Sequence, residues 1–197
     1  DLPEPSSGSA DQSCDGLIAS GVRDAQAGAL DQAEVALTRA LGCPGPDALK
    51  ELAGLRALQQ RWVEVDQLAG EALTRAPSDT YAWQLRATAR FMTDDPTGAL
   101  EAWNHAGQPR VDLFASTGLV RIPQRVVERV SGYEAGQLLS VERLRRIERQ
   151  LGDWPALTSA RVSYLPKPGG LADVVVRVTE RDRVPHRPIT LAMVGAR

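Results

Sequence analysis

The sequence contains few of the residues that catalytic and metal sites need most often. Among its 197 residues there are two histidines and two cysteines, and neither His105 nor His186 lies at ligand spacing from a cysteine. It holds no G-x-S-x-G elbow, H-E-x-x-H helix or phosphate-binding glycine loop. We therefore predict no catalytic residue, no metal and no cofactor, and expect that the chain is not an enzyme. The alternative is an enzyme whose catalytic domain follows Arg197.

Long apolar runs and aromatic residues are also scarce. No stretch of 18 apolar residues occurs, so we predict no membrane-spanning helix and expect membrane association only through a region beyond Arg197. Residues 1–13 lack the basic and apolar parts of an export signal, and their prolines, serines and glycine indicate a flexible leader. Aromatic residues make up 5% of the chain and do not alternate with basic ones, so we expect no nucleic-acid partner.

Lysine is nearly absent, and the charges that are present divide the chain in two. Residues 1–109 carry 8 basic and 16 acidic side chains, a net charge of -8. Residues 110–197 carry 15 basic and 9 acidic side chains, a net charge of +6. The change of sign predicts a domain boundary near Pro109. The length leaves room for two small domains of ordinary globular composition.

Three segments of the first half repeat one pattern of small and apolar residues. They cover residues 14–45, 46–79 and 80–109, and their starts are 32 and 34 residues apart. Small residues let the two helices predicted for each segment approach closely. The matching positions are Leu17, Gly21, Ala33, Leu37 and Ala40, then Leu49, Leu52, Ala53, Val65, Ala69 and Ala72, then Trp83, Ala87, Ala99, Trp103 and Ala106. Both the pattern and its period are typical of stacked helical hairpins.

This half resembles the tetratricopeptide repeat (TPR) family over nearly all of residues 12–108. The resemblance implies an all-α helical solenoid over residues 14–109 that binds other proteins. Arg86 and Arg90 stand where the family usually has leucine and an aromatic residue, and Val65 replaces a small residue. A generic array of antiparallel helical hairpins is therefore the alternative.

The concave face of such a solenoid gives four candidate partner-binding residues. They are Tyr81, Gln84, Thr88 and Phe91, on the first helix of the third segment. Exposed aromatic residues often anchor interfaces, which favours Tyr81 and Phe91; the alternative for Phe91 is core packing. Gly54 and Thr88 stand where asparagine would complete a carboxylate clamp, so we do not expect recognition of a C-terminal carboxylate.

The two cysteines lie at matching ends of the first predicted hairpin. We expect Cys14 to open one helix and Cys43 to close the other. An antiparallel hairpin brings these ends together, so a disulfide is geometrically reasonable. A disulfide indicates an oxidising compartment such as the periplasm. Two inert buried thiols are the alternative.

The second half changes to a different order of predicted elements. A short strand at residues 111–116 precedes a helix led by Pro123. Ser140 is a good N-cap for the next helix, whose apolar face holds Val141, Leu144, Ile147 and Leu151. Alternating apolar residues over 160–164 and 172–178, joined by a Pro-Gly-Gly turn, predict a hairpin with one buried face.

The order strand, helix, helix, strand, strand resembles the polypeptide-transport-associated (POTRA) family over residues 111–181. The features that carry the resemblance are the stretch 136–140, the helix exit at 151–157, the hairpin 164–178 and the closing Glu180. We therefore expect an α+β chain of two domains: an all-α TPR-like solenoid, then a small POTRA-like β-α-α-β-β domain at residues 110–181.

The POTRA resemblance implies peptide binding by strand addition to an exposed sheet edge. An edge strand offers unpaired N–H and C=O groups, which give affinity with little demand on sequence. The expected edge, and the second set of partner-binding candidates, is Arg161, Val162, Ser163, Tyr164 and Leu165. The alternative is that this edge is solvated or covered by a neighbouring domain.

Function and location follow from the two resemblances together. POTRA domains lie in the periplasm before outer-membrane barrels of the BamA and two-partner-secretion types, or in division proteins of the FtsQ type. We expect a non-catalytic, periplasmic segment attached to the outer membrane through a missing region, serving outer-membrane protein assembly, secretion or transport. Its partner would be an envelope protein or an unfolded outer-membrane or secreted polypeptide. The alternative is a soluble envelope scaffold of the cell-division or polysaccharide-export machinery.

The tail begins polar and ends in the apolar run 189–194. We expect residues 182–197 to form a linker or the start of a following domain. The alternative is that the run docks onto the preceding domain as an extra strand.

Overall fold

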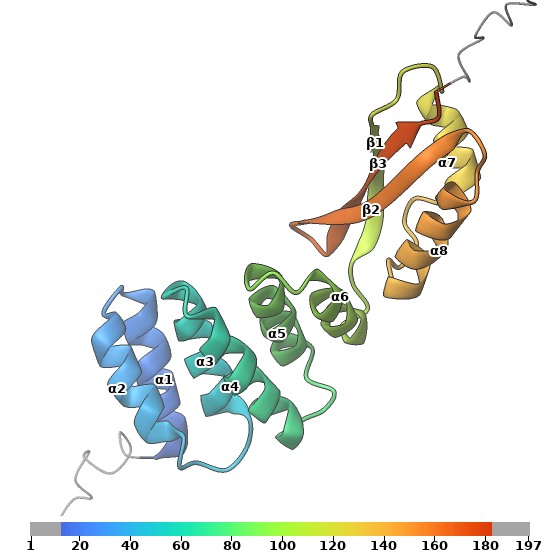
Figure 1. Ribbon diagram of the computed structural model, residues 1–197. Coiled ribbons are helices and arrows are strands. Elements are labelled where there is room, and N and C mark those ends of the chain that lie inside the picture. The colour runs from blue at the N-terminus through green and yellow to red at the C-terminus, as the bar shows by residue number, and fades with distance from the viewer. Residues whose placement is uncertain (1–12, 183–197) are drawn as a thin grey trace, which may run out of the picture.

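The computed structural model describes residues 13–182, so residues 1–12 of the predicted leader and the apolar run 189–194 lie outside this range. Six helices come first, followed by strand, helix, helix, strand, strand (Figure 1). The elements are α1 (Cys14–Gln26), α2 (Leu30–Ala40), α3 (Asp47–Leu58), α4 (Trp62–Arg75), α5 (Thr80–Met92), α6 (Pro96–His105), β1 (Arg110–Thr117), α7 (Gln124–Ser131), α8 (Val141–Gly152), β2 (Leu157–Lys167) and β3 (Leu171–Glu180). The change from helices to mixed structure falls at Pro109, where the net charge changes sign.

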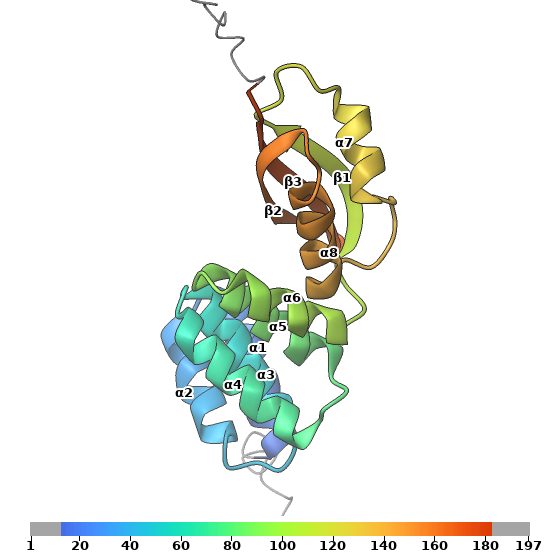
Figure 2. The ribbon, with the colours of Figure 1, turned by 45° about the vertical axis from the view of Figure 1, so that its right-hand side comes forward.

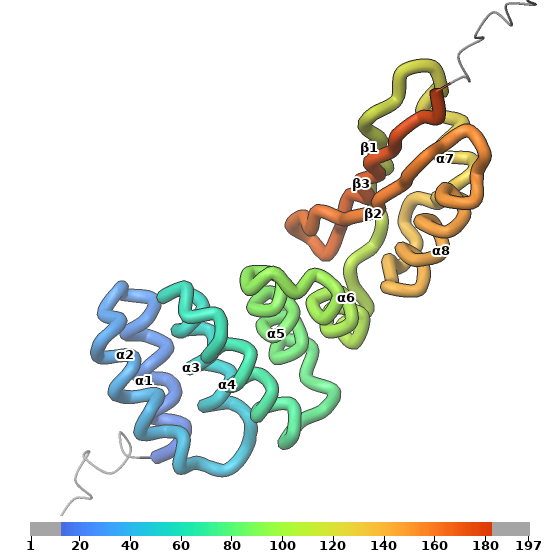
Figure 3. Tube along the Cα trace, in the orientation of Figure 1, coloured from blue at the N-terminus to red at the C-terminus, as the bar shows by residue number. Residues whose placement is uncertain are grey.

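The six helices form three antiparallel hairpins stacked side by side, which is a TPR-like helical fold (Figure 3). Their first helices begin at Cys14, Asp47 and Thr80, so the period is 33 residues at both steps. Close approach within a hairpin depends on small residues. A Cβ atom added to Gly21 would lie 2.5 Å from the Leu37 Cγ atom, so glycine lets α1 and α2 pack together.

Helix starts are fixed by the side chains that the sequence favours there. The Asp95 carboxylate accepts a hydrogen bond from the Gly98 N–H at 2.9 Å and caps α6. The Ser140 hydroxyl accepts from the Arg143 N–H at 3.2 Å and caps α8. The predicted cap at Ser140 is therefore confirmed. The helix predicted to be led by Pro123 begins one residue later, at Gln124, and Pro123 is its N-cap residue.

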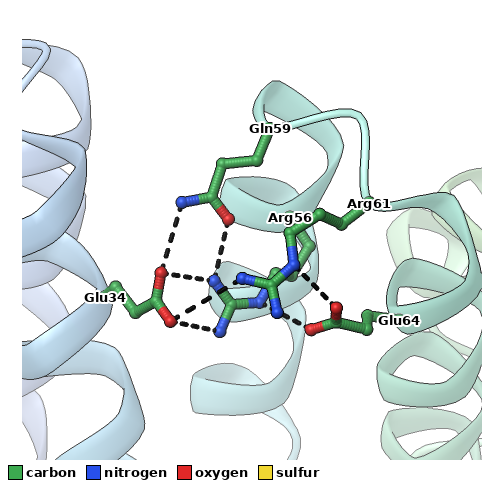
Figure 4. A network of polar contacts seen from close by, with 5 residues as sticks. All are labelled: Glu34, Arg56, Gln59, Arg61 and Glu64. Atoms are coloured by element: carbon green, nitrogen blue, oxygen red, sulfur yellow. Dashed lines mark hydrogen bonds and ion pairs between the residues drawn. The ribbon is translucent and has the colours of Figure 1, made fainter.

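Buried and half-buried ion pairs link neighbouring hairpins. Arg56, which is 7% exposed, lies between Glu34 of α2 and Glu64 of α4, with N···O distances of 2.6 and 3.0 Å (Figure 4). Gln59 and Arg61 complete the network. The hydrogen bond from Arg56 lowers the pKa of Glu34 to about 2. The network stabilises the stacking of the first hairpin on the second.

The two arginines that depart from the TPR pattern make a similar link. Arg86 and Arg90 of α5 both donate through Nε to the Asp66 Oδ1 atom of α4, each at 3.1 Å. These ion pairs lie alongside apolar contacts between the same two helices, because Val65 and Ala69 of α4 share a buried cluster with Leu85 and Ala89 of α5. The second and third hairpins are therefore joined by both kinds of contact.

The predicted disulfide is confirmed. Cys14 and Cys43 are bonded, with a Cα–Cα distance of 5.7 Å, and they close a loop with a sequence separation of 29. The bond joins the start of α1 to the segment after α2. Both ends of the first hairpin are therefore tied at one point.

The second half is a three-stranded sheet with strand order β1-β3-β2. β1 runs parallel to β3, and β2 runs antiparallel to it. Helices α7 and α8 cover one face of the sheet (Figures 1 and 2). Ala172, Val174, Val176 and Val178 are buried beneath them, which confirms the predicted alternation along this strand. β1 spans two residues more than the predicted 111–116.

A buried carboxylate closes the far end of the sheet. Glu180, whose side chain is 5% exposed, accepts hydrogen bonds from the N–H groups of Val120, Arg121 and Ile122 at 2.7, 2.8 and 2.9 Å. These backbone donors, and the Arg121 guanidinium with them, lower the pKa of Glu180 to about 2. The loop between β1 and α7 is therefore fastened to the end of β3.

The two halves share one apolar core. Leu100 of α6 is fully buried in the same cluster as the sheet residues, with Phe91 and Trp103 packed against it. Trp103 meets Tyr164 of β2 edge to face at a ring-centroid distance of 6.4 Å. The Asn104 amide donates to the carbonyl oxygen of Leu139, just before α8, at 2.8 Å. The boundary near Pro109 separates types of structure, but packing is continuous across it.

Candidate protein-binding site

The outer edge of β2 is the first part of the candidate site. β2 pairs with β3 on one side only. Pro166 has no N–H, so it fits this strand where its nitrogen points away from β3. Backbone groups of alternate residues point to the same side, so the N–H and C=O of Val162 and Tyr164 also point outward. Within residues 13–182, no hydrogen bond from another element reaches them.

A groove lies directly beside this edge. It encloses about 250 Å³ and is lined by residues from three elements. They are Pro96, Thr97 and Leu100 of α6, Val141, Leu144, Arg145 and Glu148 of α8, and Val162, Ser163 and Tyr164 of β2. The unpaired backbone groups of β2 therefore adjoin a largely apolar cavity.

Tyr164 holds the groove in shape. Its hydroxyl donates to the Pro96 carbonyl oxygen at 2.6 Å, and its ring lies 5.9 Å from the Phe91 ring. Burial raises the pKa of Tyr164, so the hydroxyl stays protonated and remains a donor. These contacts fix the start of α6 beside β2.

The five residues predicted at the edge divide between the two faces of the sheet. Val162 and Tyr164 point toward the helices, and Tyr164 is only 6% exposed. Arg161, Ser163 and Leu165 are exposed; they alternate with these two residues, which directs their side chains to the opposite face, although Ser163 also borders the groove. In strand addition, Tyr164 would therefore offer its backbone groups rather than its side chain.

The four candidates on the array do not gather at one place. Tyr81 is 45% exposed and lines a groove of about 270 Å³ with Val22, Leu55 and Leu58. Gln84 and Thr88 line a different cavity, which reaches the turn between β2 and β3. Phe91 packs in the shared core, as the alternative interpretation held.

The groove at Tyr81 has its own electrostatics. Gly54 makes room for the tyrosine, because an added Cβ would lie 3.0 Å from the Tyr81 hydroxyl oxygen. Glu51 also lines this groove. Burial raises the pKa of Glu51 and the pKa of Tyr81. This groove therefore combines mainly apolar side chains with one half-buried carboxyl group.

Several residues of the site were missed by sequence reasoning. Thr97, Leu100 and Leu144 line the groove beside β2, and Leu58 lines the one at Tyr81. Leu144 follows from the apolar face of its helix, but no local signal places α6 against β2. Within residues 13–182, no group of three or more His, Cys, Asp or Glu side chains could hold a metal ion. The helices described there are each too short or too polar to cross a membrane.

Comparison with known proteins gives two partial structural likenesses. No protein-family model and no curated protein matches the chain. The first TPR of Spaghetti (RPAP3), solved bound to the HSP90 peptide SRMEEVD, is 18% identical with a TM-score of 0.47, covering 49% of this chain and 78% of that one. The globular C-terminal domain of P. aeruginosa LpoP is 26% identical with a TM-score of 0.45, covering 49% and 97%. The TPR-like description therefore depends on the hairpins and their period.

Proposed function

We propose that this chain is a non-catalytic, protein-binding segment that captures extended polypeptide by strand addition at β2. The observation that carries the proposal is the outer edge of β2, where outward N–H and C=O groups of Val162 and Tyr164 lie beside the groove. A peptide strand pairing here gains main-chain hydrogen bonds, while the groove receives side chains. The array would hold the site in place and recruit a second protein through its concave face.

We place this activity in the bacterial periplasm. The Cys14–Cys43 disulfide supports an oxidising compartment, and the strand-helix-helix-strand-strand order supports a POTRA-like domain. Attachment to the outer membrane would come from a region beyond Arg197. The polypeptide bound would be an unfolded outer-membrane or secreted protein, so the role is in outer-membrane protein assembly, secretion or transport.

The test removes one outward donor from the strand edge. Val162→Pro deletes an N–H that β3 does not use, so the sheet should stay folded while strand addition fails. We expect crosslinking of a photoreactive synthetic peptide of alternating valine and threonine to fall at least about tenfold, the loss of roughly 1.4 kcal/mol or more. Val162→Thr keeps the N–H and the branched shape, and should crosslink normally.

Two measurements make the result decisive. Circular dichroism checks that Val162→Pro keeps the fold, and mass spectrometry of the crosslinked product locates the peptide. Crosslinking that stays unchanged in folded Val162→Pro, or that maps to the groove at Tyr81, would contradict strand addition at β2.

A further inference from the structure

The groove beside β2 is built by both halves of the molecule. Its floor holds Leu100, which is fully buried, and Val141, which is 6% exposed. Leu144 and Val162 add apolar lining, and Thr97, exposed on the first turn of α6, lines the groove from the array. The helical array is thus one wall of the groove rather than only its support.

The size of the groove decides what kind of group it can hold. An apolar cavity of about 150 Å³ accommodates a benzene ring, whereas pockets for drug-sized ligands enclose about 300–1,000 Å³. The volume of about 250 Å³ therefore suits one or two amino-acid side chains and is small for a larger organic ligand.

The alternation of side chains along β2 determines which ligand side chains face the groove. Val162 and Tyr164 point toward α8, and an added strand alternates in step with its neighbour, so every second ligand side chain would point to the same face. A ligand residue opposite Val162 would enter the groove, which Leu144 and Thr97 also line. Its neighbours along the strand would point away from the groove.

The charge at the rim of the groove gives a second criterion for which ligand residues bind there. Arg145 is exposed on the rim of the groove, and among the described residues no carboxylate oxygen lies within 4.0 Å of its guanidinium. Glu148 lies one turn further along α8 on the same rim. An acidic ligand residue would therefore pair at the Arg145 end.

We infer that the site selects extended segments with a branched aliphatic side chain facing the groove and an acidic residue near Arg145, and that α6 of the array helps to set this preference. The inference depends on strand addition at β2, and extends it from backbone capture to side-chain selection. The array and the sheet then recognise one ligand together.

The main experiment fills the groove from the array side. Thr97→Trp places a large side chain in the groove without altering β2, and Thr97→Ser is its control. The probe is a fluorescent 12-residue peptide of alternating valine and threonine, with a second version carrying alanine at the groove-facing positions. We expect Thr97→Trp to lower the affinity for the valine peptide about tenfold or more, because the valine side chains can no longer be buried in the groove. The affinity for the alanine peptide should stay unchanged.

A second variant tests the groove independently, in case Thr97→Trp does not fold. Leu144→Ala enlarges the groove and should shift preference from valine toward leucine and phenylalanine at the groove-facing position, by about three- to tenfold in the ratio of affinities. Arg145→Ala should lower the affinity by roughly two- to fivefold, and only for a peptide that carries one aspartate near the rim of the groove. Arg145→Lys should restore part of that loss.

The outcomes separate this inference from the proposed function. If Val162→Pro abolishes binding but Thr97→Trp and Leu144→Ala leave the peptide preferences unchanged, strand addition holds and side-chain selection by the groove is wrong. If Val162→Pro has no effect, the proposed function itself fails. Equal losses for the valine and alanine peptides in Thr97→Trp would also overturn the inference.

Discussion

The array and the sheet domain solve the same packing problem by different means. In the array, helices approach through small residues, and polar networks at Arg56 and Asp66 join neighbouring hairpins. In the sheet domain, a continuous row of valines packs under α7 and α8. The array thus pairs these charged groups with one another between its hairpins. The sheet leaves the outer edge of β2 unpaired, which is where we place the ligand.

The strongest test of this comparison asks whether the halves are energetically separate. Leu100→Ala removes a fully buried side chain from the core that both halves share, and we expect it to lower the free energy of unfolding by about 3 kcal/mol. Hydrogen exchange measured by mass spectrometry should show loss of protection in α8 and β2 as well as in α5 and α6.

A matched substitution within the array gives the control. Leu37→Ala removes a leucine that is 1% exposed, but from the cluster between the first two hairpins. Its loss of protection should stay within the array. Loss confined to the array in both variants would show that the two halves fold independently.

Removal of the disulfide should destabilise the array and leave the sheet unaffected. Replacing both cysteines with alanine opens a loop with a sequence separation of 29, and should lower the free energy of unfolding by roughly 3 kcal/mol. Thermal unfolding measures this, and reductant added to the unaltered protein should reproduce most of it. A fall in the stability of α8 and β2 equal to that of α1 and α2 would contradict a local role.

The smallest expected effect concerns the network at Arg56. The pKa of Glu34 is lowered to about 2, so its stabilisation is present above about pH 4.5, the unfolded value, and is lost as the pH falls toward 2. The side chain is about one third exposed, so we expect only about 1 kcal/mol. The difference in unfolding free energy between the unaltered protein and Glu34→Gln should shrink over this pH range.

An exposed position on α4 supplies the comparison for this pH series. Glu71→Gln removes an exposed carboxylate that pairs with Arg75 one turn along the same helix, and should change the unfolding free energy little at any pH. A pH-independent difference for Glu34→Gln would show that the substitution acts through packing instead of charge.

Local features were predictable from the sequence, and contacts between distant segments were not. Ser140 and Asp95 carry cap signals within their own turns, and the alternation from Ala172 to Val178 predicts one buried face. The cysteines could be paired because a hairpin fixes the relation of its ends. These inferences need only geometry within a few residues or one hairpin.

The missed features all depend on how whole elements pack together. Tyr164 and Pro96 are 68 residues apart in sequence, and nothing near either residue indicates their contact. Phe91 looked like a surface anchor because its spacing fits a concave face, but the sheet covers that end of α5. The groove is the product of this docking, so its residues on α6 carry no signal of their own.

The Glu180 carboxylate has a mechanical consequence. β1 begins directly after the array and β3 ends at Glu180, and the two strands run parallel as hydrogen-bonded neighbours. Tension between the array and the chain beyond residue 180 would load that pairing in shear, so several hydrogen bonds would resist together. The amide groups of Val120, Arg121 and Ile122 hold Glu180 at the point where the force enters. The sheet therefore transmits tensile force to the array without sequential breakage of the hydrogen bonds between β1 and β3.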